Sequence, residues 1–221
     1  KQYAHYGYND FIICTGYKGE VIKDYFMNFY IYQSDITVDL QTNEVEIHRK
    51  QTEDWKVSIV DTGLQSSGME RLIMVRELAG DEPVLVAYGD CLSDINIQKM
   101  VESHCRQQSL ATVAIAHPTG RNEILALNEQ GCYIGTKQGK KQKHSWVNAC
   151  SMVLEARAFD YLKENQENHF ALSLMDCLAA HEPVQTYRHE GFWSPVETIR
   201  DKTWMETLWA QHKAPWKVWE D

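Results

Sequence analysis

Residues 83–94 constrain the fold of this chain more than any other segment does. An apolar run at residues 84–88 leads into Gly89-Asp90, and an amphipathic segment follows it. This order is typical of a buried parallel strand that delivers a carboxylate to the crevice beyond its carboxyl end, where open α/β sheets bind ligands. Asp90 is therefore a candidate ligand for Mg²⁺ beside nucleotide phosphates, and the alternative is a plain turn after a buried strand.

The same alternation of apolar and amphipathic segments runs along the whole chain. Strands are expected at residues 11–14, 57–60, 84–88, 111–116, 146–154 and 184–187, and helices at residues 18–29, 69–78, 94–107, 156–165, 170–180 and 198–209. Two hairpins, at residues 36–47 and 124–135, are expected as well, the first with one face in water. The pattern predicts a doubly wound α/β sheet with added β-hairpins.

The length and composition of the chain limit its class. The 221 residues fit one domain, residues 1–221, in which residues 198–221 form a helix and a Trp-rich tail expected to dock on the core or on a neighbouring subunit. A net charge of −9 argues against a nucleic-acid partner, and no apolar run has the length of a membrane span. Six scattered cysteines without C-x-x-C spacing indicate free thiols, so we expect a cytoplasmic protein without a membrane partner.

A set of short motifs carries a resemblance to one enzyme family. In chain order they are Tyr3-Ala4-His5-Tyr6-Gly7-Tyr8-Asn9-Asp10, Gly16-Tyr17-Lys18-Gly19, Val60-Asp61-Thr62-Gly63, Tyr88-Gly89-Asp90, Gly191-Phe192-Trp193-Ser194-Pro195, Arg200-Asp201-Lys202 and Lys213-Ala214-Pro215-Trp216-Lys217. In order and spacing they resemble the sugar-nucleotide pyrophosphorylases, specifically the glucose-1-phosphate cytidylyltransferases, over nearly the whole chain. The resemblance implies a Rossmann-like mixed sheet of the nucleotide-diphospho-sugar transferase type.

The resemblance also implies a nucleotidyltransferase of sugar-nucleotide biosynthesis. Its reaction would convert CTP and glucose 1-phosphate into CDP-glucose and pyrophosphate, with Mg²⁺ as cofactor. Because the attacking sugar phosphate is already an anion, such an enzyme mainly positions two polyanions and neutralises developing charge. The implied partners are CTP or another nucleotide, a sugar 1-phosphate, and further copies of the chain in a homo-oligomer.

Two acidic residues match the family's metal ligands. Asp90 stands at the position of the first, and Glu197 at the position of the second, where the family carries Asp. The added methylene of Glu moves its oxygens by about 1.5 Å, which matters because Mg²⁺ demands near-octahedral geometry. The alternative for Glu197 is an acidic residue that favours the first turn of a helix. The catalytic hypothesis requires both carboxylates to converge on one cation at the rim of the sheet.

Four further residues are candidate substrate contacts. Arg71 matches the Arg of a base-recognising motif, and Asn148 matches the Asn of an Asn-Gly-Gly-Phe-Phe motif in which Cys150 replaces the second Gly. Lys140 or Lys141, in the basic run at residues 137–144, would hold phosphates in place of a family Lys that the aligned residues lack. The alternative for this run is a solvated loop.

The resemblance implies departures from the family as well. The family's Gly-rich phosphate loop, first strand and a phosphate-binding Lys would lie upstream of Lys1, so we expect a truncated, inactive chain whose sheet lacks its first strand. Side chains at former Gly positions are expected to crowd a ligand. The alternative function is a non-catalytic homologue, either a partner subunit or a sugar-nucleotide-binding module.

Overall fold

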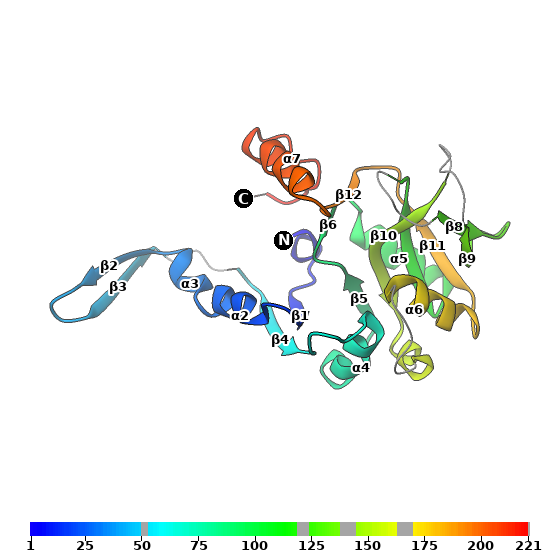
Figure 1. Cartoon of the computed structure of the whole chain (residues 1–221), viewed down its shortest axis with the longest axis horizontal. Helices are drawn as coiled ribbons and strands as arrows, with labels where there is room; N and C mark the ends of the chain where they lie inside the picture. The colour runs from blue at the N-terminus through cyan, green and yellow to red at the C-terminus, as the bar shows by residue number, and fades with distance from the viewer. Residues whose placement is uncertain (50–52, 119–123, 138–144, 163–169, 221) are drawn as a thin grey trace. The chain divides into compact units, whose positions relative to one another are not determined.

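The computed structural model describes residues 1–49, 53–118, 124–137, 145–162 and 170–220 (Figure 1). It divides into two compact units. The large unit contains Lys1–Gly7 and Ser67–Asp221, and the small unit contains Tyr8–Ser66. That the two units form one domain stays a prediction. Among the described residues, no helix is both long and apolar enough to cross a membrane.

The small unit is built on two parallel strands. β1 (Asp10–Thr15) pairs with β4 (Lys56–Asp61) along its whole length. α2 (Gly19–Met27) and α3 (Phe29–Tyr32) follow β1, so the helix expected at residues 18–29 is divided in two. The two strands expected in this part of the chain are confirmed.

Close backbone approach and ring contacts attach these helices to the strands. A Cβ at Gly19 would lie 2.8 Å from Thr15 Oγ1, so α2 can begin this close to β1 only with glycine there. The ring of Trp55 lies 6.0 Å from that of Phe11 in β1 and 5.9 Å from that of Phe29 in α3. Aromatic pairs at these separations add to the stabilisation from buried area.

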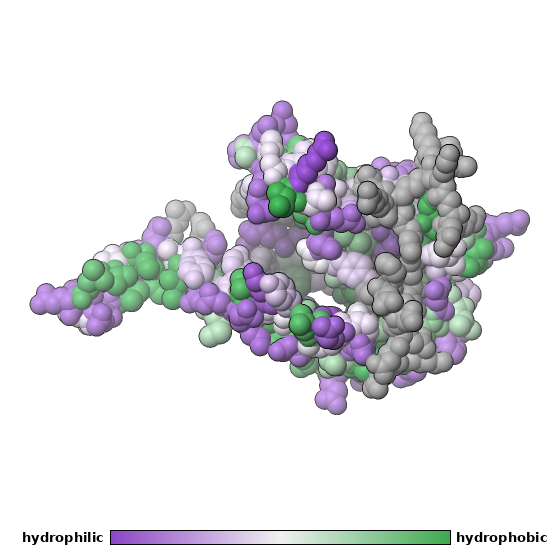
Figure 2. All heavy atoms as spheres, in the orientation of Figure 1, coloured by the Kyte–Doolittle hydropathy of each residue, from purple (hydrophilic) through white to green (hydrophobic). Residues whose placement is uncertain are grey.

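The small unit also contains the hairpin of β2 (Asp35–Asp39) and β3 (Glu44–Arg49). The chain reverses between them with Asn43 in the left-handed region, at a φ of 59°. The prediction of only one wet face is wrong, because every residue of β2 is exposed. Alternating apolar residues give a hairpin one apolar face, but that face is buried only where another helix or strand packs against it. Figure 2 shows hydrophobic surface along this hairpin.

The large unit contains a four-stranded mixed sheet. Its order is β11 (Val184–Arg188), β7 (Ala111–Ala116), β10 (Val147–Leu154) and β5 (Val84–Ala87). β11 and β7 are parallel, and β10 runs antiparallel to both β7 and β5. The prediction of a buried parallel strand before Asp90 is therefore corrected, since β5 is only partly buried and pairs antiparallel. A short apolar run does not specify whether the adjacent strand of the sheet is parallel or antiparallel.

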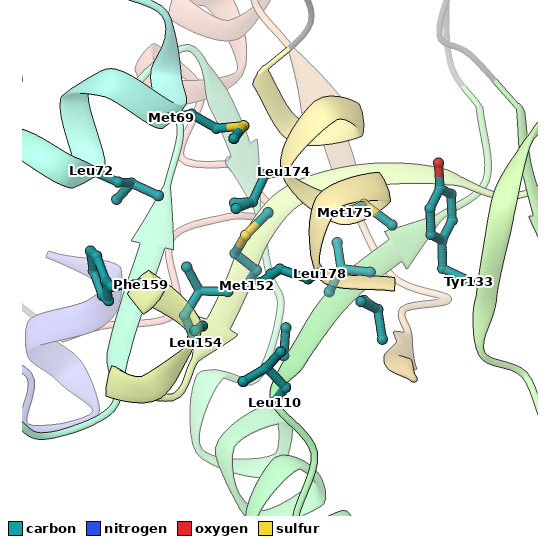
Figure 3. Close-up of a cluster of buried hydrophobic side chains, with 14 of the residues drawn as sticks. Met69, Leu72, Leu110, Tyr133, Met152, Leu154, Phe159, Leu174, Met175 and Leu178 are labelled. Atoms are coloured by element: carbon teal, nitrogen blue, oxygen red, sulfur yellow. The ribbon is translucent and has the colours of Figure 1, made fainter. Parts of the chain in front are cut away.

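Helices cover both faces of this sheet, as the doubly wound pattern predicts. β7 is buried on both faces, and its alternate residues point to opposite sides. Val113 belongs to a hydrophobic cluster that includes residues of α6 (Phe170–Ala179), part of which Figure 3 shows. Thr112 faces the other side, where it bonds to His104 of α5 (Ile97–Gln107).

Two predicted helices contribute residues to the same hydrophobic cluster, and one of them is a 3₁₀ helix instead of an α-helix. α4 (Gly68–Ala79) confirms the helix predicted at residues 69–78 and ends at Gly80. The helix predicted at residues 156–165 is instead a 3₁₀ helix, Ala156–Tyr161, and residues 163–169 lie outside the described residues. Over so short a segment, hydrophobic spacing does not separate a 3₁₀ helix from an α-helix.

Short antiparallel pairs complete the large unit. β8 (Ile124–Leu127) and β9 (Tyr133–Lys137) confirm the second predicted hairpin. The sequence does not predict the other pair, β6 (Cys91–Ser93) with β12 (Trp193–Pro195), because each strand has only three residues. Because residues 91–93 join this pair, the helix predicted from residue 94 begins only at the start of α5, with Asn96 as its N-cap.

The C-terminal part of the large unit follows the prediction. α7 (Ile199–Ala210) confirms the last predicted helix, and Thr198 is its N-cap. Trp216 is buried, and its ring lies 5.6 Å from that of Phe192. The tail therefore docks on the core of its own unit, as expected.

Candidate active site

The turn that carries Asp90 is held against the segment that carries Glu197. β6 and β12 pair with Cys91 opposite Pro195, and one more backbone bond extends the ladder, from the Val196 N–H to Asp90 O at 2.7 Å. Glu197 follows directly, so the two acidic residues lie at the same end of the ladder, and both are exposed. The backbone thus brings together the two segments that the sequence predicts to converge. The role of each carboxylate stays a prediction.

Glu197 precedes α7 and does not lie within its first turn. Thr198 is the N-cap, and the acidic residue of the first turn is Asp201. Asp201 Oδ2 accepts hydrogen bonds from the backbone N–H of Thr198 at 2.9 Å and of Glu197 at 3.2 Å. Hydrogen bonds from Thr198 hold the pKa of Asp201 below its ordinary value. The helix-terminus alternative for Glu197 therefore applies to Asp201, and the Glu197 carboxylate lies outside the capping box.

A bulge in β10 links Asn148, through Cys150, to the segment that precedes Asp90. The pairing of β10 with β7 is interrupted between Asn148 and Met152, and Cys150 lies in the left-handed region at a φ of 62°. Asn148 Oδ1 accepts a hydrogen bond from the Cys150 N–H at 2.7 Å, while Cys150 O accepts one from the Tyr88 N–H at 3.1 Å. The Asn148 carbonyl thus stabilises the bulge, and its amide Nδ2 donates to Met175 Sδ of α6 at 3.8 Å, which leaves one N–H of the amide for a ligand.

Thiols and phenols lie beside the Asp90 carboxylate. Cys91 Sγ is 3.6 Å from Asp90 Oδ1, and the neighbouring Cys150 thiol, together with burial, raises the pKa of Cys91 above its ordinary value. Burial raises the pKa of Tyr88, and it also raises the pKa of Tyr3, whose hydroxyl bonds to a serine of β10 at 3.0 Å. Both phenols therefore stay neutral near pH 7, which leaves the carboxylates as the charged groups of this turn.

Arg71 lies in the first turn of α4, whose N-cap is Ser67. The Ser67 N–H donates to Glu70 Oε2 at 2.6 Å, and the Glu70 N–H donates to Ser67 Oγ at 3.3 Å. Hydrogen bonds from Ser67 lower the pKa of Glu70. Met69 and Leu72, the other neighbours of Arg71 in this turn, belong to the hydrophobic cluster of Figure 3, so the core fixes its backbone.

Lys140 and Lys141 fall within residues 138–144, which lie outside the described residues. Their proposed contact with phosphate therefore stays a prediction. The elements on either side are β9, which ends at residue 137, and β10, which begins at residue 147.

A His–Asp pair supports the other end of the β6–β12 ladder, and the sequence analysis misses it. His189 is buried, and its Nε2 lies 2.9 Å from Asp94 Oδ1 and donates to Phe192 O at 3.0 Å. The Asp94 N–H also donates to Phe192 O, at 3.1 Å. Residue 191 must be small, because a Cβ on Gly191 would lie 2.5 Å from Asp94 Oδ1. The Gly-Phe-Trp motif is the signal that could have indicated such close packing.

The pair of Asp90 and Glu197 suits a hard cation. In the part of the chain that the structure describes, no group of three or more His, Cys, Asp or Glu side chains is placed to hold a metal ion. Mg²⁺ keeps several waters and is commonly bound through one or two carboxylates plus substrate phosphates. The two exposed carboxylates offer oxygen donors of the kind that such a site uses, whereas a structural zinc site needs four ligands.

Curated relatives match the chain along its whole length, although no protein-family model matches it. A glucose-1-phosphate cytidylyltransferase of Salmonella typhi is 37% identical over 222 residues, which cover 100% of this chain and 85% of that protein. A probable glucose-1-phosphate cytidylyltransferase of Bacillus subtilis is 32% identical over 222 residues, covering 99% of this chain and 85% of that protein.

Solved structures share the fold at low sequence identity. An inositol-1-phosphate CTP transferase from T. maritima matches with a TM-score of 0.69 at 10% identity, over 99% of this chain and 82% of that one. A UDP-glucose pyrophosphorylase complexed with UDP-glucose gives a TM-score of 0.68 at 15% identity, over 96% and 84%. HddC from Yersinia pseudotuberculosis gives 0.65 at 13% identity, over 91% and 79%. These matches confirm the α/β fold predicted from the sequence.

Proposed function

Because the chain belongs to the glucose-1-phosphate cytidylyltransferase family, we propose that the protein transfers the cytidylyl group of CTP to glucose 1-phosphate. An oxygen of the sugar phosphate forms a bond to the α-phosphorus of CTP, the bond from that phosphorus to the β-phosphate oxygen breaks, and pyrophosphate leaves. The observation that carries the proposal within the structure is the backbone bond that joins the Asp90 turn to the segment of Glu197.

The proposal gives Asp90 and Glu197 the role of metal ligands. Both offer exposed carboxylate oxygens, the donor type that Mg²⁺ prefers, and the capping box of α7 fixes the backbone immediately after Glu197. When bound there, Mg²⁺ would neutralise negative charge on the triphosphate. The two carboxylates position that charge, and neither is required to remove a proton, since the attacking phosphate is already ionised.

The remaining candidates would bind and orient the substrates. The Asn148 amide can donate its second N–H to a hydroxyl or carbonyl oxygen, because its carbonyl is occupied at the bulge and its other N–H donates to Met175 Sδ. Arg71 supplies a cation from a firmly held helical turn, and Lys140 or Lys141 would supply a second for the phosphates. Neutral Tyr88 adds no negative charge next to an anionic substrate.

We further propose that the protein is cytoplasmic and assembles with copies of itself. All six cysteines are free thiols, which is typical of a reducing compartment. On α7, Trp204 and Trp209 are 47% and 48% exposed, and Trp is enriched at protein interfaces. Analytical ultracentrifugation tests the assembly, and a protein that sediments as a monomer at micromolar concentrations would contradict it.

The proposed reaction is tested with the full-length protein, CTP, glucose 1-phosphate and Mg²⁺. CDP-glucose is detected by chromatography with mass spectrometry, and pyrophosphate by a coupled assay. We expect product only with Mg²⁺, and we expect Asp90→Asn to lower the rate by roughly 10²–10³-fold, as loss of a charge-stabilising group does. The matched control is Glu206→Gln, which removes an exposed carboxylate of α7 that lies 3.5 Å from Lys202, and it should leave the rate unchanged.

Two other results of this experiment would contradict the proposed reaction. Calorimetric binding of CTP without any product would contradict the enzyme and identify the non-catalytic binding module instead. If neither CDP-glucose nor CTP binding is found, the protein neither performs the family's reaction nor binds its nucleotide.

A further inference from the structure

The short ladder of β6 and β12 is bonded at both of its ends. At one end the Val196 N–H donates to Asp90 O at 2.7 Å, and at the other the Asp94 N–H donates to Phe192 O at 3.1 Å. Among the strands that the structure describes, no third one extends this two-stranded sheet. Two strands alone are marginally stable, so the contacts at the ends of the ladder decide how firmly it is held.

His189 connects one end of this ladder to the four-stranded sheet. It follows β11 directly, and its N–H donates to Ile115 O of β7 at 2.8 Å, so its backbone continues the pairing of those two strands. Its buried side chain belongs to the ladder end, where Nε2 donates to Phe192 O at 3.0 Å and lies 2.9 Å from Asp94 Oδ1. One residue therefore ties the larger sheet to the ladder that carries Asp90.

The groups at this end are packed too tightly to adjust. A Cβ on Gly191 would lie 2.8 Å from His189 Cε1 and 2.5 Å from Asp94 Oδ1. Phe192 O accepts from both the imidazole and the Asp94 N–H, which uses both lone pairs of that carbonyl. The imidazole, the carboxylate and the carbonyl are therefore fixed relative to one another, and removal of the imidazole would release this end of the ladder.

We propose that His189 and Asp94 are positioning residues, which set the relative position of Asp90 and Glu197 from the opposite end of the ladder. Only the three residues of β6 separate the two ends along that strand. Over so short a segment a shift at one end moves the other, and a misplacement of about 1 Å costs roughly 10²-fold in rate. The effect on catalysis rests on the proposed function, whereas the effect on the ladder does not.

Hydrogen exchange of the full-length protein under native conditions tests the effect on the ladder. His189→Leu keeps a side chain of similar size but removes the N–H that Phe192 O accepts. We expect the Val196 amide, at the opposite end, to exchange roughly tenfold faster, because a bond at the end of a short ladder exchanges by local opening. His189→Gln retains an N–H donor and should restore most of the protection. Unchanged exchange at Val196 in His189→Leu would overturn the inference.

A buried histidine elsewhere in the large unit provides the matched control. His104 also bonds to a carboxylate, that of Glu155, and it makes no bond to the ladder. His104→Ala should therefore leave the exchange at Val196 unchanged, although it lowers the stability of the fold. Equal acceleration in His104→Ala and His189→Leu would reduce the effect to a general loss of stability and overturn the inference.

A second variant decides the matter if His189→Leu does not fold. Asp94→Asn keeps the size of the side chain and removes the charge beside His189 Nε2, so it is expected to fold. The Val196 amide should then exchange several-fold faster than in the wild type. Exchange at the wild-type rate would overturn the inference.

The same variants connect the ladder to catalysis once CDP-glucose formation is measured. His189→Leu should lower kcat roughly 10²-fold with little change in KM for glucose 1-phosphate, and His189→Gln should recover most of kcat. A kcat that stays unchanged in His189→Leu would overturn the positioning role. An inactive wild type in which the exchange at Val196 responds as expected would overturn the proposed function alone, and an active protein in which it does not respond would overturn this inference alone.

Discussion

The large unit holds two groups of polar side chains that each contain a carboxylate, and they differ in burial. In the first, His104 is 1% exposed, its Nδ1 bonds to Thr112 Oγ1 at 2.9 Å, and its Nε2 donates to Glu155 Oε1 at 3.0 Å. Ser109 Oγ also lies within 3.2 Å of Nδ1. In the second, the backbone of Asp90 is bonded to the segment of Glu197, but both side chains are exposed.

This difference in burial indicates that the first group is a structural network and the second a candidate site. The Ser–His–Glu geometry around His104 is that of a nucleophile, a base and an acid, yet Ser109 and Thr112 are buried, so no substrate can reach them. Each of these groups has a partner, and the network can only stabilise the fold. At the Asp90 turn the backbone is fixed while the carboxylates face solvent, which is what a ligand site requires.

The largest expected effect falls on the exposed pair. Glu197→Gln removes the second carboxylate, so we expect the rate of CDP-glucose formation to fall by roughly 10²-fold. Glu197→Asp keeps a carboxylate and should retain activity within about tenfold. Because the side chain is exposed, the melting temperature of both variants should stay within about 2 °C of the wild type. A large loss of stability would show that Glu197 is structural and would remove the contrast with His104.

The opposite result is expected for the buried network. His104→Ala leaves Glu155 and Thr112 without their bonds to the imidazole and opens a cavity, so we expect a loss of about 3 kcal/mol in the free energy of unfolding. Urea denaturation measures this loss. The rate per folded molecule should stay unchanged. A loss below about 1 kcal/mol would mean that the network is not the structural element described above.

An intermediate effect is expected at the pair of buried His189 and partly buried Asp94. In Gly191→Ala the new methyl group would lie 2.5 Å from Asp94 Oδ1, so we expect destabilisation of about 2 kcal/mol from overpacking. Gly89→Ala is the matched control for stability, because nothing lies within 4 Å of a Cβ there, and it should cost less than about 0.5 kcal/mol. Equal losses in the two variants would exclude the steric explanation.

The sequence indicates Asp90 and Glu197 as candidates, but it does not predict the strand pairing that brings their segments together. Asp90 and Glu197 are identified from motifs, whereas β6 and β12, which bring them together, have only three residues each and show no periodicity. The bulge at Cys150 is also hidden, because a run such as residues 146–154 predicts a continuous strand. A bulge is fixed by hydrogen bonds such as the one from the Cys150 N–H to Asn148 Oδ1, which depends on tertiary structure.

Predictions of burial from the sequence fail for a similar reason, because burial depends on which other element packs against a strand. The alternation in β2 predicts one covered face, but both faces are exposed. The apolar run of β5 predicts burial in a parallel sheet, yet β10 pairs with it in the antiparallel direction. The predictions of α4 and α7 succeed because the ends of these helices carry local signals, such as Thr198 and Asp201 at the start of α7.

The smallest effect is expected at the capping box beside Glu197, and it depends on pH. Hydrogen bonds from Thr198 lower the pKa of Asp201 from its ordinary value of 3.8, so the ionised carboxylate stabilises the folded state. This contribution is complete at a pH above 3.8 and is lost as the pH falls through the lowered pKa. The difference in melting temperature between the wild type and Asp201→Asn should therefore be constant from pH 7 to about pH 5 and shrink below about pH 4. If the difference instead grew on acidification, the carboxylate would be destabilising the start of α7, and the backbone next to Glu197 would not be held by this box.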